Sequence, residues 1–380
     1  MNWEPKKFSQ IMTVKKGEPI TKAEANEGQY PVILGGKEPA YFINRFNHEG
    51  KAIVVSRSGA SAGFVSYWNE PIFITDGFLI EPLDGNCFEY VYYLLKYFGK
   101  ALRDLQNGSA IPHVTPKTIY GLKAPVPTSR EQERIVSILS AYDNLIEVNN
   151  KRIKMLEQMA ENLYKEWFLR FRFPGHETAE FDDGIPKGWT RNRISKYYHT
   201  SSGGTPSRDK DEEYYGGKIP WIKTGELQDC LIIDTEEHIT ETAIKKSSAK
   251  VFPRESVLMA MYGVNIGMLA YSTIEAACNQ ACCVFTDKGT NSTKHYLFQC
   301  LKSIRDYLLL IGFGAAQQNL SQDLIKRIRI IMPDQDTVTR FEQLIEPLYI
   351  EAKYLISANA NLIKQRDMLL PRLMSGKLEV

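Results

Sequence analysis

Signals of membrane-spanning and secreted proteins are absent from this 380-residue chain. No run of 18 apolar residues occurs, which excludes a membrane span. The first residues, Met1–Pro5, lack the basic and then apolar pattern of a secretory signal. Neither charge dominates, with 47 Lys and Arg against 45 Asp and Glu, so the chain is not a wholly basic nucleic-acid binder, although one face can still be positive. We expect a cytoplasmic protein with reduced thiols.

Sequence motifs of catalysis and metal binding are also missing. The chain has no C-x-x-C pair, no H-E-x-x-H, no phosphate-binding G-x-x-x-x-G-K-[ST] and no Asn/Asp-Pro-Pro-aromatic methyltransferase motif. A metal site can be drawn from Cys278, Cys282 and His295, but buried cysteines that act as small apolar side chains explain this spacing better. These absences favour a protein without catalysis of its own.

One pattern resembles the P-D…E-x-K metal site of many endonucleases. It consists of Pro333 and Asp334, followed by Glu351 and Lys353. Both later residues fall on a predicted long helix, whereas this chemistry needs carboxylates that converge on a metal ion, normally from a strand. We interpret the match as a coincidence; magnesium-dependent cleavage by the purified chain alone would contradict that interpretation.

The chain repeats itself. Three landmarks share a shift of 204 residues: Gly59, Gly63 and Tyr67 recur as Gly263, Gly267 and Tyr271. Two earlier landmarks share a shift of 186: Trp3 and Gly17 recur as Trp189 and Gly203. Segment 108–115 recurs at 314–321 with a shift of 206. Since several collinear matches make chance a poor explanation, we predict two copies of one unit. The shift grows from 186 to 204, so the second copy carries 18 extra residues, which we place between Arg208 and Lys223.

The front of each copy has the pattern of a mixed α+β domain. Short β-branched and aromatic runs between turn residues predict strands at 51–56, 71–75, 77–80, 256–259 and 281–285. The periodicity that follows predicts amphipathic helices at 89–105 and 293–310.

The back of each copy has the pattern of a coiled coil. Apolar residues recur at alternating steps of four and three from Ile135 to Trp167, interrupted by Asn149. The second copy repeats the pattern from Phe341 to Leu373. There the polar interruptions are Asn359 and Arg366. Two unrelated helices, each packed on its own domain, would also show such stripes. The length of about ten layers in both copies favours the coiled coil.

The register of the two helices can be predicted if they run antiparallel. One residue number then rises as the opposing one falls, so the numbers of opposing residues have a constant sum. The full-overlap register pairs Ile135 with Leu373, Trp167 with Phe341, and Asn149 with Asn359. Each buried amide then has a partner, and one polar layer fixes the register. A helix from 135 to 167 is about 50 Å long, against roughly 34 Å for one turn of B-DNA. Two recognition domains at its ends would meet half-sites about one to one and a half turns apart.

Three segments resemble one known family. Residues 139–168 (LSAYDNLIEVNNKRIKMLEQMAENLYKEWF) resemble the central conserved helix of specificity (S) subunits of type I restriction–modification systems. Residues 366–376 resemble the C-terminal conserved region of that family, and residues 184–189 resemble the entry to a target recognition domain. The resemblance spans essentially the whole chain, including its repeat.

The resemblance implies an α+β fold, in which an antiparallel two-helix coiled coil separates two target recognition domains in a pseudo-two-fold repeat. The implied divisions are recognition domains at 1–129 and 171–336, the central helix at 130–170 and the C-terminal helix at 337–380. It also implies a non-catalytic subunit that reads a bipartite, asymmetric sequence in double-stranded DNA. Two modification (M) subunits, which methylate adenine with S-adenosylmethionine, would dock on it. Restriction (R) subunits, which use ATP and Mg²⁺, would join them. This chain itself would bind no cofactor or metal.

Two other functions stay open from the residues alone: a stand-alone metal-dependent endonuclease, and a coiled-coil adaptor without a DNA role. Salt-sensitive DNA binding would argue against the adaptor, because phosphate contacts release counterions.

Polar residues on loops that are equivalent in the two copies are the candidates for DNA contact. In the first copy they are Lys37, Arg45, Arg57, Ser58, Ser61 and His113. In the second copy they are Arg208, Lys223, Tyr262, Asn265, Gln317, Gln318 and Asn319. For any single position, a solvated loop residue is an equally good interpretation. Candidates for docking M subunits lie near the end of the first long helix: Tyr164, Glu166, Trp167 and Phe168. Trp167 fits slightly better as a plug at the end of the coiled coil.

Overall fold

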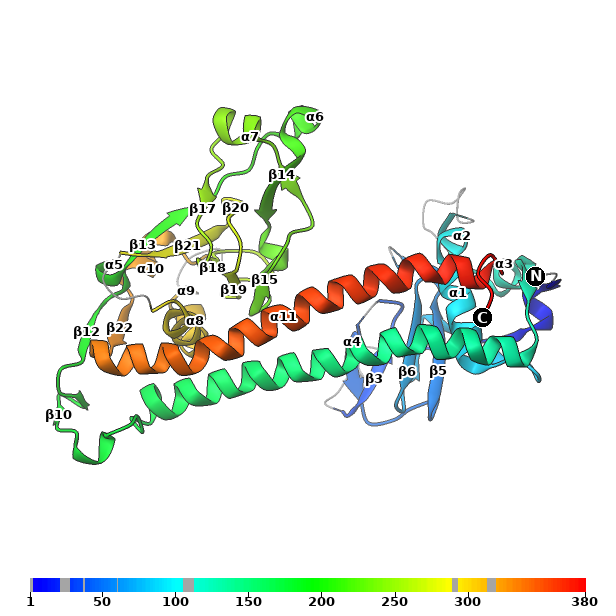
Figure 1. Ribbon diagram of the computed structural model, residues 1–380, viewed down its shortest axis with the longest axis horizontal. Helices are drawn as coiled ribbons and strands as arrows, with labels where there is room; N and C mark the ends of the chain where they lie inside the picture. The colour runs from blue at the N-terminus through cyan, green and yellow to red at the C-terminus, as the bar shows by residue number, and fades with distance from the viewer. Residues whose placement is uncertain are drawn as a thin grey trace. The chain divides into compact units, whose positions relative to one another are not determined.

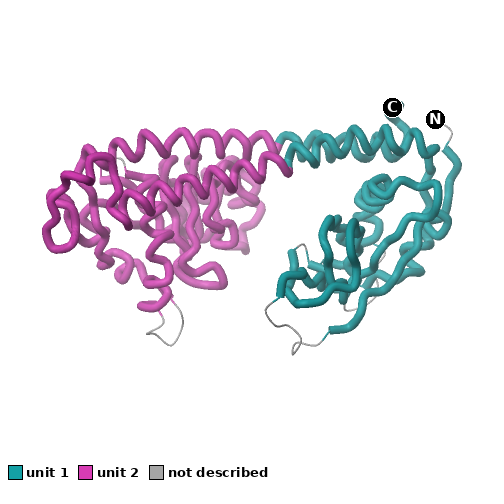
Figure 2. Tube along the Cα trace, turned by 90° about the horizontal axis from the view of Figure 1, so that it is seen from below, with its two compact units in different colours: residues 1–146, 361–380 teal, residues 147–360 magenta. Residues whose placement is uncertain are grey.

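The computed structural model describes residues 3–20, 28–36, 38–59, 61–104, 113–288, 293–312 and 319–380 (Figure 1). The chain divides into two compact units, which Figure 2 shows in different colours. Unit 1 comprises residues 1–146 and 361–380, and unit 2 comprises residues 147–360. Two long helices, α4 (Ser129–Tyr164) and α11 (Gln335–Met374), contribute residues to both units. Within the described ranges, no helix is both long and apolar enough to cross a membrane.

Unit 1 is built on a four-stranded sheet in the order β2-β8-β5-β6. Its other strands form a three-stranded sheet, β4-β3-β7, and the pair β1-β9. The strands are β1 (Glu4–Lys7), β2 (Met12–Lys16), β3 (Tyr30–Ile33), β4 (Tyr41–Ile43), β5 (Lys51–Ser56), β6 (Val65–Asn69), β7 (Phe73–Ile74), β8 (Gly77–Pro82) and β9 (Lys123–Val126). The helices are α1 (Phe88–Tyr97), α2 (Gly99–Asp104), α3 (Pro116–Gly121) and the 3-10 turn η1 (Phe8–Gln10).

Unit 2 is built on a five-stranded sheet in the order β13-β21-β18-β19-β15, accompanied by the sheet β16-β14-β20-β17 and the pairs β12-β22 and β10-β11. The strands are β10 (Phe181–Asp182), β11 (Ile185–Pro186), β12 (Thr190–Arg193), β13 (Tyr198–Ser202), β14 (Tyr215–Ile222), β15 (Cys230–Ile232), β16 (His238–Ile239), β17 (Val251–Phe252), β18 (Val257–Ala260), β19 (Leu269–Ser272), β20 (Ala276–Cys278), β21 (Cys282–Asp287) and β22 (Arg329–Met332). The α-helices are α5 (Ile194–Tyr197), α6 (Asp211–Tyr214), α7 (Glu241–Lys246), α8 (Lys294–Ser303), α9 (Arg305–Gly312) and α10 (Gln322–Arg327). Shorter turns are the π-helix η3 (Lys165–Leu169) and the 3-10 turns η4 (His176–Thr178), η5 (Arg208–Lys210) and η6 (Thr224–Glu226).

The two units repeat one strand pairing, which confirms the predicted α+β repeat. In unit 1, β3 runs antiparallel to β4 and parallel to β7. In unit 2, β14 has the same two relations to β16 and β20. Two equivalent glycines serve one purpose. A Cβ added to Gly17 would lie 2.5 Å from the Ile74 oxygen, and one added to Gly203 would lie 2.0 Å from the Cys278 oxygen. Only glycine allows this close approach of two backbones.

The extra residues of unit 2 lie mostly outside the segment in which we expected them. Equivalent residues of the two units can be identified from the strand pairing. Trp221 corresponds to Val32, which is a shift of 189 residues. The shift then rises to 196 between Ile43 and Ile239 and to 204 between Ile53 and Val257. Growth of the shift from 186 to 189 puts three extra residues before Trp221. The remaining fifteen lie between Trp221 and Val257, where β15, α7 and β17 are. The repeat has no landmark between Gly203 and Gly263. The sequence alone could therefore not show where between these two residues the insertion lies.

Each helix predicted after the strands is broken once. In place of one helix at 89–105, the described residues to 104 form α1 and α2, separated at Phe98. In place of one helix at 293–310, the chain forms α8 and α9, separated at Ile304. Both residues leave the helical region, with φ and ψ of −85° and 3° at Phe98 and −101° and 11° at Ile304. The apolar period runs through both breaks, so the period alone could not reveal them.

Helices α4 and α11 pair antiparallel within each unit. In unit 2, the rings of Trp167, just beyond α4, and Phe341 lie 5.9 Å apart, and the side chains of Asn149 and Asn359 are hydrogen-bonded at 2.8 Å. In unit 1, Ile135 and Leu373 belong to one buried cluster. The fold class, with its antiparallel helical pair, is therefore confirmed.

The second polar residue of the α11 stripe, Arg366, has its own partners in unit 1. Its guanidinium donates a hydrogen bond to Asp143 of α4, whose carboxylate also accepts one from the Tyr93 hydroxyl at 2.6 Å. Burial alone would lower the pKa of Arg366, but its hydrogen bonds to Asp143 and Asp367 outweigh burial and raise it. Arg366 thus stays charged within this layer.

Candidate nucleic-acid interface

A cluster of polar side chains gathers where three loops of unit 1 meet. We call Arg57, Ser58, Asp76 and His113 the unit 1 loop cluster. The residue after Arg57 forms a β-bridge with His113, and the Val114 N–H donates to the Arg57 oxygen at 2.9 Å. The sequence candidates Arg57, Ser58 and His113 thus lie together in the folded chain.

Asp76 organises this cluster. Arg57 Nε lies 2.7 Å from Asp76 Oδ1 without the alignment of a hydrogen bond, so the contact is an ion pair. The Ser58 hydroxyl donates to the other oxygen of the same carboxylate. The Arg57 side chain remains 36% exposed, and His113 is exposed. Arg57 is therefore held in place yet partly open to solvent, as a side chain that contacts DNA must be.

Unit 2 has the same cluster with different side chains. Met261, Tyr262, Gln280 and Asn319 are equivalent to the four residues of unit 1 and form the unit 2 loop cluster. The Leu320 N–H donates to the Met261 oxygen at 2.8 Å, which reproduces the bond between Val114 and Arg57. Met261 is buried, whereas Tyr262, Gln280 and Asn319 are exposed. The charged pair of unit 1 is thus replaced by uncharged groups.

The other sequence candidates fall in three places. Lys37, Gln317 and Gln318 lie outside the described residues. Arg45 is exposed and its guanidinium lies over the Phe73 ring at 4.7 Å. Ser61 is half-buried within the β5–β6 turn, where its carbonyl accepts from the Phe64 N–H at 2.9 Å.

Two basic candidates of unit 2 are held by carboxylates. Arg208 pairs with Asp211 and Glu237 and stacks on the Tyr215 ring at 3.8 Å. Lys223 Nζ lies 3.0 Å from a carboxylate oxygen of Glu236 and equally near one of Glu237. Hydrogen bonds from Arg208 and then Lys223 lower the pKa of Glu237, so this carboxylate stays ionised between them. Three carboxylates around two cations do not favour phosphate binding, which weakens the proposed DNA role of Arg208 and Lys223.

Asn265 holds a turn in place. Its side-chain amide donates to the Thr224 oxygen at 2.9 Å and so ties the β18–β19 turn to η6. This contact gives Asn265 a structural role that the sequence did not indicate.

Asp76 and Gln280 belong to the two clusters but are not among the candidates named from the sequence. The Gln280 side-chain oxygen accepts a hydrogen bond from the Thr205 hydroxyl. Asp76 and Gln280 are themselves separated by the repeat's shift of 204, and this correspondence is the signal that could have found both.

The proposed docking residues are mostly buried. Tyr164, Trp167 and Phe168 are 3%, 5% and 3% exposed and belong to the core of unit 2. The Phe168 ring lies 4.8 Å from that of Phe341. Glu166 is more exposed and pairs with Arg170 and Arg172. The three aromatic side chains therefore offer little accessible surface to a partner, and their docking role stays a prediction. The alternative, in which Trp167 closes the end of the helical pair, agrees with its packing.

The nuclease-like residues have structural partners. Asp334 precedes α11 and accepts hydrogen bonds from the Thr337 N–H at 2.9 Å and the Trp189 indole at 2.9 Å. Glu351 lies on α11 and pairs with Arg152 at 2.7 Å. These carboxylates are about 25 Å apart along a helix, since each residue rises 1.5 Å. They cannot hold one metal ion.

The cysteine site that could be drawn from the sequence also does not form. His295 lies 2.6 Å from a carboxylate oxygen of Glu342, and the Cys282 thiol donates to the Asn279 side chain. Within the part of the chain that the structure describes, no three His, Cys, Asp or Glu side chains gather to hold a metal ion.

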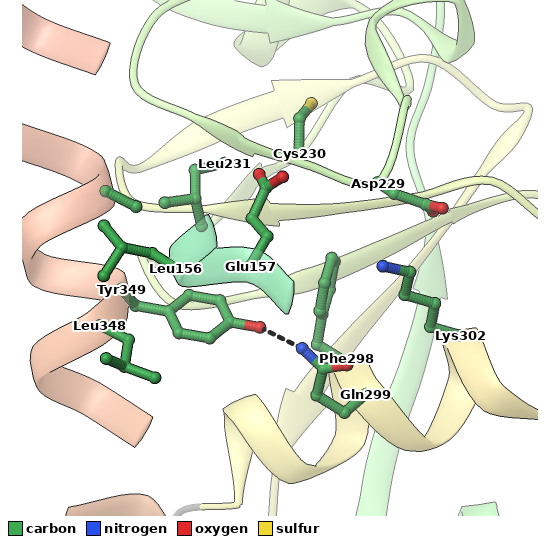
Figure 3. A pocket seen from close by; sticks show the side chains of 11 residues that line it. Leu156, Glu157, Asp229, Cys230, Leu231, Phe298, Gln299, Lys302, Leu348 and Tyr349 are labelled. Atoms are coloured by element: carbon green, nitrogen blue, oxygen red, sulfur yellow. Dashed lines mark hydrogen bonds between the residues drawn. The ribbon is translucent and has the colours of Figure 1, made fainter. Parts of the chain in front are cut away.

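A small pocket lies in unit 2 between the two long helices and the β-sheet domain (Figure 3). Leu156 and Glu157 of α4 line it together with Asp229, Gln299 and Tyr349. Gln299 donates to the Tyr349 hydroxyl at 3.0 Å. Burial raises the pKa of Glu157, and the nearby Asp229 adds to this effect. The pocket brings the Glu157 carboxyl group of α4 close to Asp229.

Comparisons with known proteins agree with this architecture. A family model described as the type I restriction modification DNA specificity domain matches residues 1–158 and 186–356. The chain is 29% identical over 343 residues to the type I restriction enzyme MjaIX specificity subunit of Methanocaldococcus jannaschii, covering 87% of this chain and 78% of that protein. It is 23% identical over 359 residues to the HindI specificity subunit of Haemophilus influenzae, covering 76% of this chain and 77% of that protein.

A solved structure shows the same fold. The crystal structure of the type I restriction–modification S subunit from M. genitalium aligns with a TM-score of 0.61 and 18% identity, covering 98% of this chain and 96% of that one. The family model matches well over half of the chain and includes both copies of the repeat. The chain therefore belongs to the family of specificity subunits of type I restriction–modification systems.

Proposed function

We propose that the chain reads a bipartite, asymmetric DNA sequence, with one target recognition domain in each unit. The observation that carries the proposal is a loop cluster that occurs at equivalent positions of both units with different side chains. Arg57 and Asp76 of unit 1 correspond to Met261 and Gln280 of unit 2. Because donors, acceptors and apolar groups on base edges are matched by the identity of the side chain, two unlike clusters read two unlike half-sites.

The proposed recognition domains are residues 1–129 and 171–336, which the helical segments 130–170 and 337–380 join. In this proposal the paired helices set the number of unspecified base pairs between the half-sites. A hydrogen-bonded pair such as Asn149 and Asn359 suits this purpose, since a fixed helical register keeps the length constant.

We place the docking of M subunits on an apolar stripe beside the seam of α4 and α11. On α4 it comprises Val148, Met155 and Met159, which are 52%, 58% and 55% exposed. On α11 it comprises Leu344 and Tyr354, which are 53% and 69% exposed. Large exposed apolar side chains that follow a helical period mark a surface for another protein.

The two parts of the stripe lie on one side of the helical pair. Each stripe residue precedes a seam residue by one position, as Val148 precedes Asn149. Arg152 of α4 and Glu351 of α11 hold the same position and form an ion pair at 2.7 Å. Since this pair crosses the groove between the helices, the apolar residues on either side of it form one surface for amphipathic helices of a partner.

The full complex then divides the chemistry among its subunits. Two M subunits methylate adenine with S-adenosylmethionine, and R subunits cleave DNA with ATP and Mg²⁺ in the cytoplasm. This chain supplies recognition and assembly, and its own residues carry out no catalytic step.

Co-expression with the neighbouring M subunit tests the proposal. Methylated adenines are mapped across the DNA of the host, and cells that carry the M subunit alone serve as the control. We expect one motif with two specified parts that differ in sequence, separated by a constant unspecified gap. A palindromic or uninterrupted motif would contradict the reading by two unlike domains, and methylation without this chain would contradict its role altogether.

A further inference from the structure

The β18–β19 turn, residues 261–268, has a support that has no counterpart among the described residues of unit 1. Strand β15 pairs in parallel with β19 and forms the edge of the five-stranded sheet. The equivalent sheet of unit 1 ends at β6, the strand that corresponds to β19. Strand β15 therefore belongs to the insertion of unit 2, and it begins next to Asp229.

Asp229 is tied to the strand that follows the turn. Its backbone N–H donates to the Leu269 oxygen at 2.7 Å, and its carboxylate accepts from the Leu269 N–H at 3.2 Å. Its φ of 58° lies in the left-handed region, which Asp tolerates better than most residues. The insertion thus places a carboxylate beside the end of the turn.

Arg305, at the start of α9, connects this carboxylate to the turn itself. One guanidinium nitrogen donates to Asp229 Oδ2 at 2.8 Å, and the other donates to Oδ1 of the same residue. Its Nε donates to the Gly267 oxygen at 2.9 Å. The side chains of Arg305 and Asp229 are only 20% and 17% exposed. The planar guanidinium is needed here, since an ammonium group cannot make these three bonds in one plane.

The turn is also held at its centre. The Asn265 amide donates to the Thr224 oxygen, and Thr224 belongs to the same inserted segment as Asp229. Just before these two supports the turn exposes side chains: Tyr262 is 37% exposed, and Val264 is fully exposed at 103%. The supported backbone therefore presents its side chains outward in one defined arrangement.

We propose that Arg305 is a positioning residue for DNA recognition by unit 2. Through Asp229 and the Gly267 oxygen it holds the β18–β19 turn in one conformation, so that the exposed side chains of the turn meet their half-site without first having to be ordered. The inserted segment that carries Thr224 and Asp229 acts as the support. This inference rests on the proposed reading of one half-site by each unit.

The test selects DNA from a library that is randomised in both half-sites, with the complex of this chain and its M subunit. The variants are Arg305→Ala and Arg305→Lys. The matched control is Lys302→Met, which removes the Lys302–Glu161 ion pair, at 26% and 25% exposure, in the same unit. Thermal unfolding of each complex is measured in parallel.

For Arg305→Ala we expect a loss of about tenfold in base discrimination within one half-site only, the size of one mismatched base pair. Arg305→Lys should lose less of the base discrimination, because lysine keeps the positive charge. It should still lose some, because an ammonium group lacks the planar set of donors of the guanidinium. Lys302→Met should keep the wild-type preference in both half-sites. A merely structural role predicts weaker binding to all sequences with unchanged preference.

Unchanged preference with both Arg305 variants would overturn the proposal, and so would an equal loss in both half-sites. Where Arg305→Ala does not fold, Arg305→Lys decides alone by the same criterion. A wild-type complex that selects no bipartite sequence would overturn the proposed function itself, an outcome that is visible before any variant is compared.

Discussion

The side chain of Asn149 donates a hydrogen bond to the side-chain oxygen of Asn359 at 2.8 Å, in the seam between α4 and α11. Both residues are 6% exposed. The Asn359 amide in turn donates to the Asn150 side chain at 2.9 Å. A polar layer of this kind is satisfied only when the two asparagines are opposite each other, so any slip along the helices would leave buried amides without partners.

Removing one of these asparagines should cost more than removing both. Asn149→Leu or Asn359→Leu leaves the other amide buried without its partner, which we expect to lower the free energy of unfolding by about 1–3 kcal/mol. The double variant places two leucines in the seam and should recover much of this loss. Urea unfolding of the purified chain measures all three. Single variants as stable as the wild type would show that the layer does not hold the register.

Arg57→Ala should relax the recognition of one half-site. The change removes the positive side chain that Asp76 holds at 2.7 Å. We expect weaker binding to the methylation motif and about a tenfold loss of discrimination in the half-site read by unit 1, with the other half-site unchanged. Selection from a randomised DNA library measures both. Equal effects in the two half-sites would argue against one reading domain per unit, and wild-type behaviour would remove Arg57 from the interface.

Charges in the apolar stripe should prevent assembly without unfolding the chain. Met155 and Met159 are more than half exposed, so Met155→Glu with Met159→Glu should leave stability nearly unchanged. The two carboxylates would be desolvated in an apolar contact, and we expect the M subunit to be lost on co-purification. Lys154→Glu, a change at the exposed position directly before Met155, is the control. Retention of the M subunit by the double variant would place the docking surface elsewhere.

The stability contributed by Asp334 should depend on pH. Burial alone would raise its pKa, but hydrogen bonds from the Thr337 N–H and hydroxyl and from the Trp189 indole outweigh burial and lower it. A carboxyl whose pKa is lower in the folded state stabilises the fold above its ordinary value of 3.8, and this contribution disappears as the pH falls through the lowered pKa. Asp334→Asn keeps a good helix cap and removes the charge.

The variant should therefore be less stable than the wild type at pH 7, and the difference should shrink below about pH 4. Urea unfolding of both proteins across this range measures it. A difference that stays constant with pH would mean that the cap geometry, and not the charge, is what Asp334 contributes.

Patterns in the sequence were enough to predict the repeat, several strands and the seam of the long helices. The period of a strand or a helix can be recognised from residues that are close in sequence. For two antiparallel helices, the only further unknown is their register. The pairing of Asn149 with Asn359 supplies that unknown, because burying an unpaired amide is costly. The strand runs at 51–56 and 281–285 were readable for the same reason, as their apolar side chains serve a buried sheet.

Other features depend on contacts between distant residues, and no local pattern carries them. The break at Phe98, the carboxylates that neutralise Arg208 and the burial of Trp167 each depend on segments that meet only after folding. Asp229 and Arg305 are 76 residues apart and acquire a common role only because β15 is inserted beside β19. The free energy of such an interaction depends on how far the two side chains are buried and on their hydrogen-bond geometry. Both are set by the folded structure and cannot be read from the order of residues along the chain.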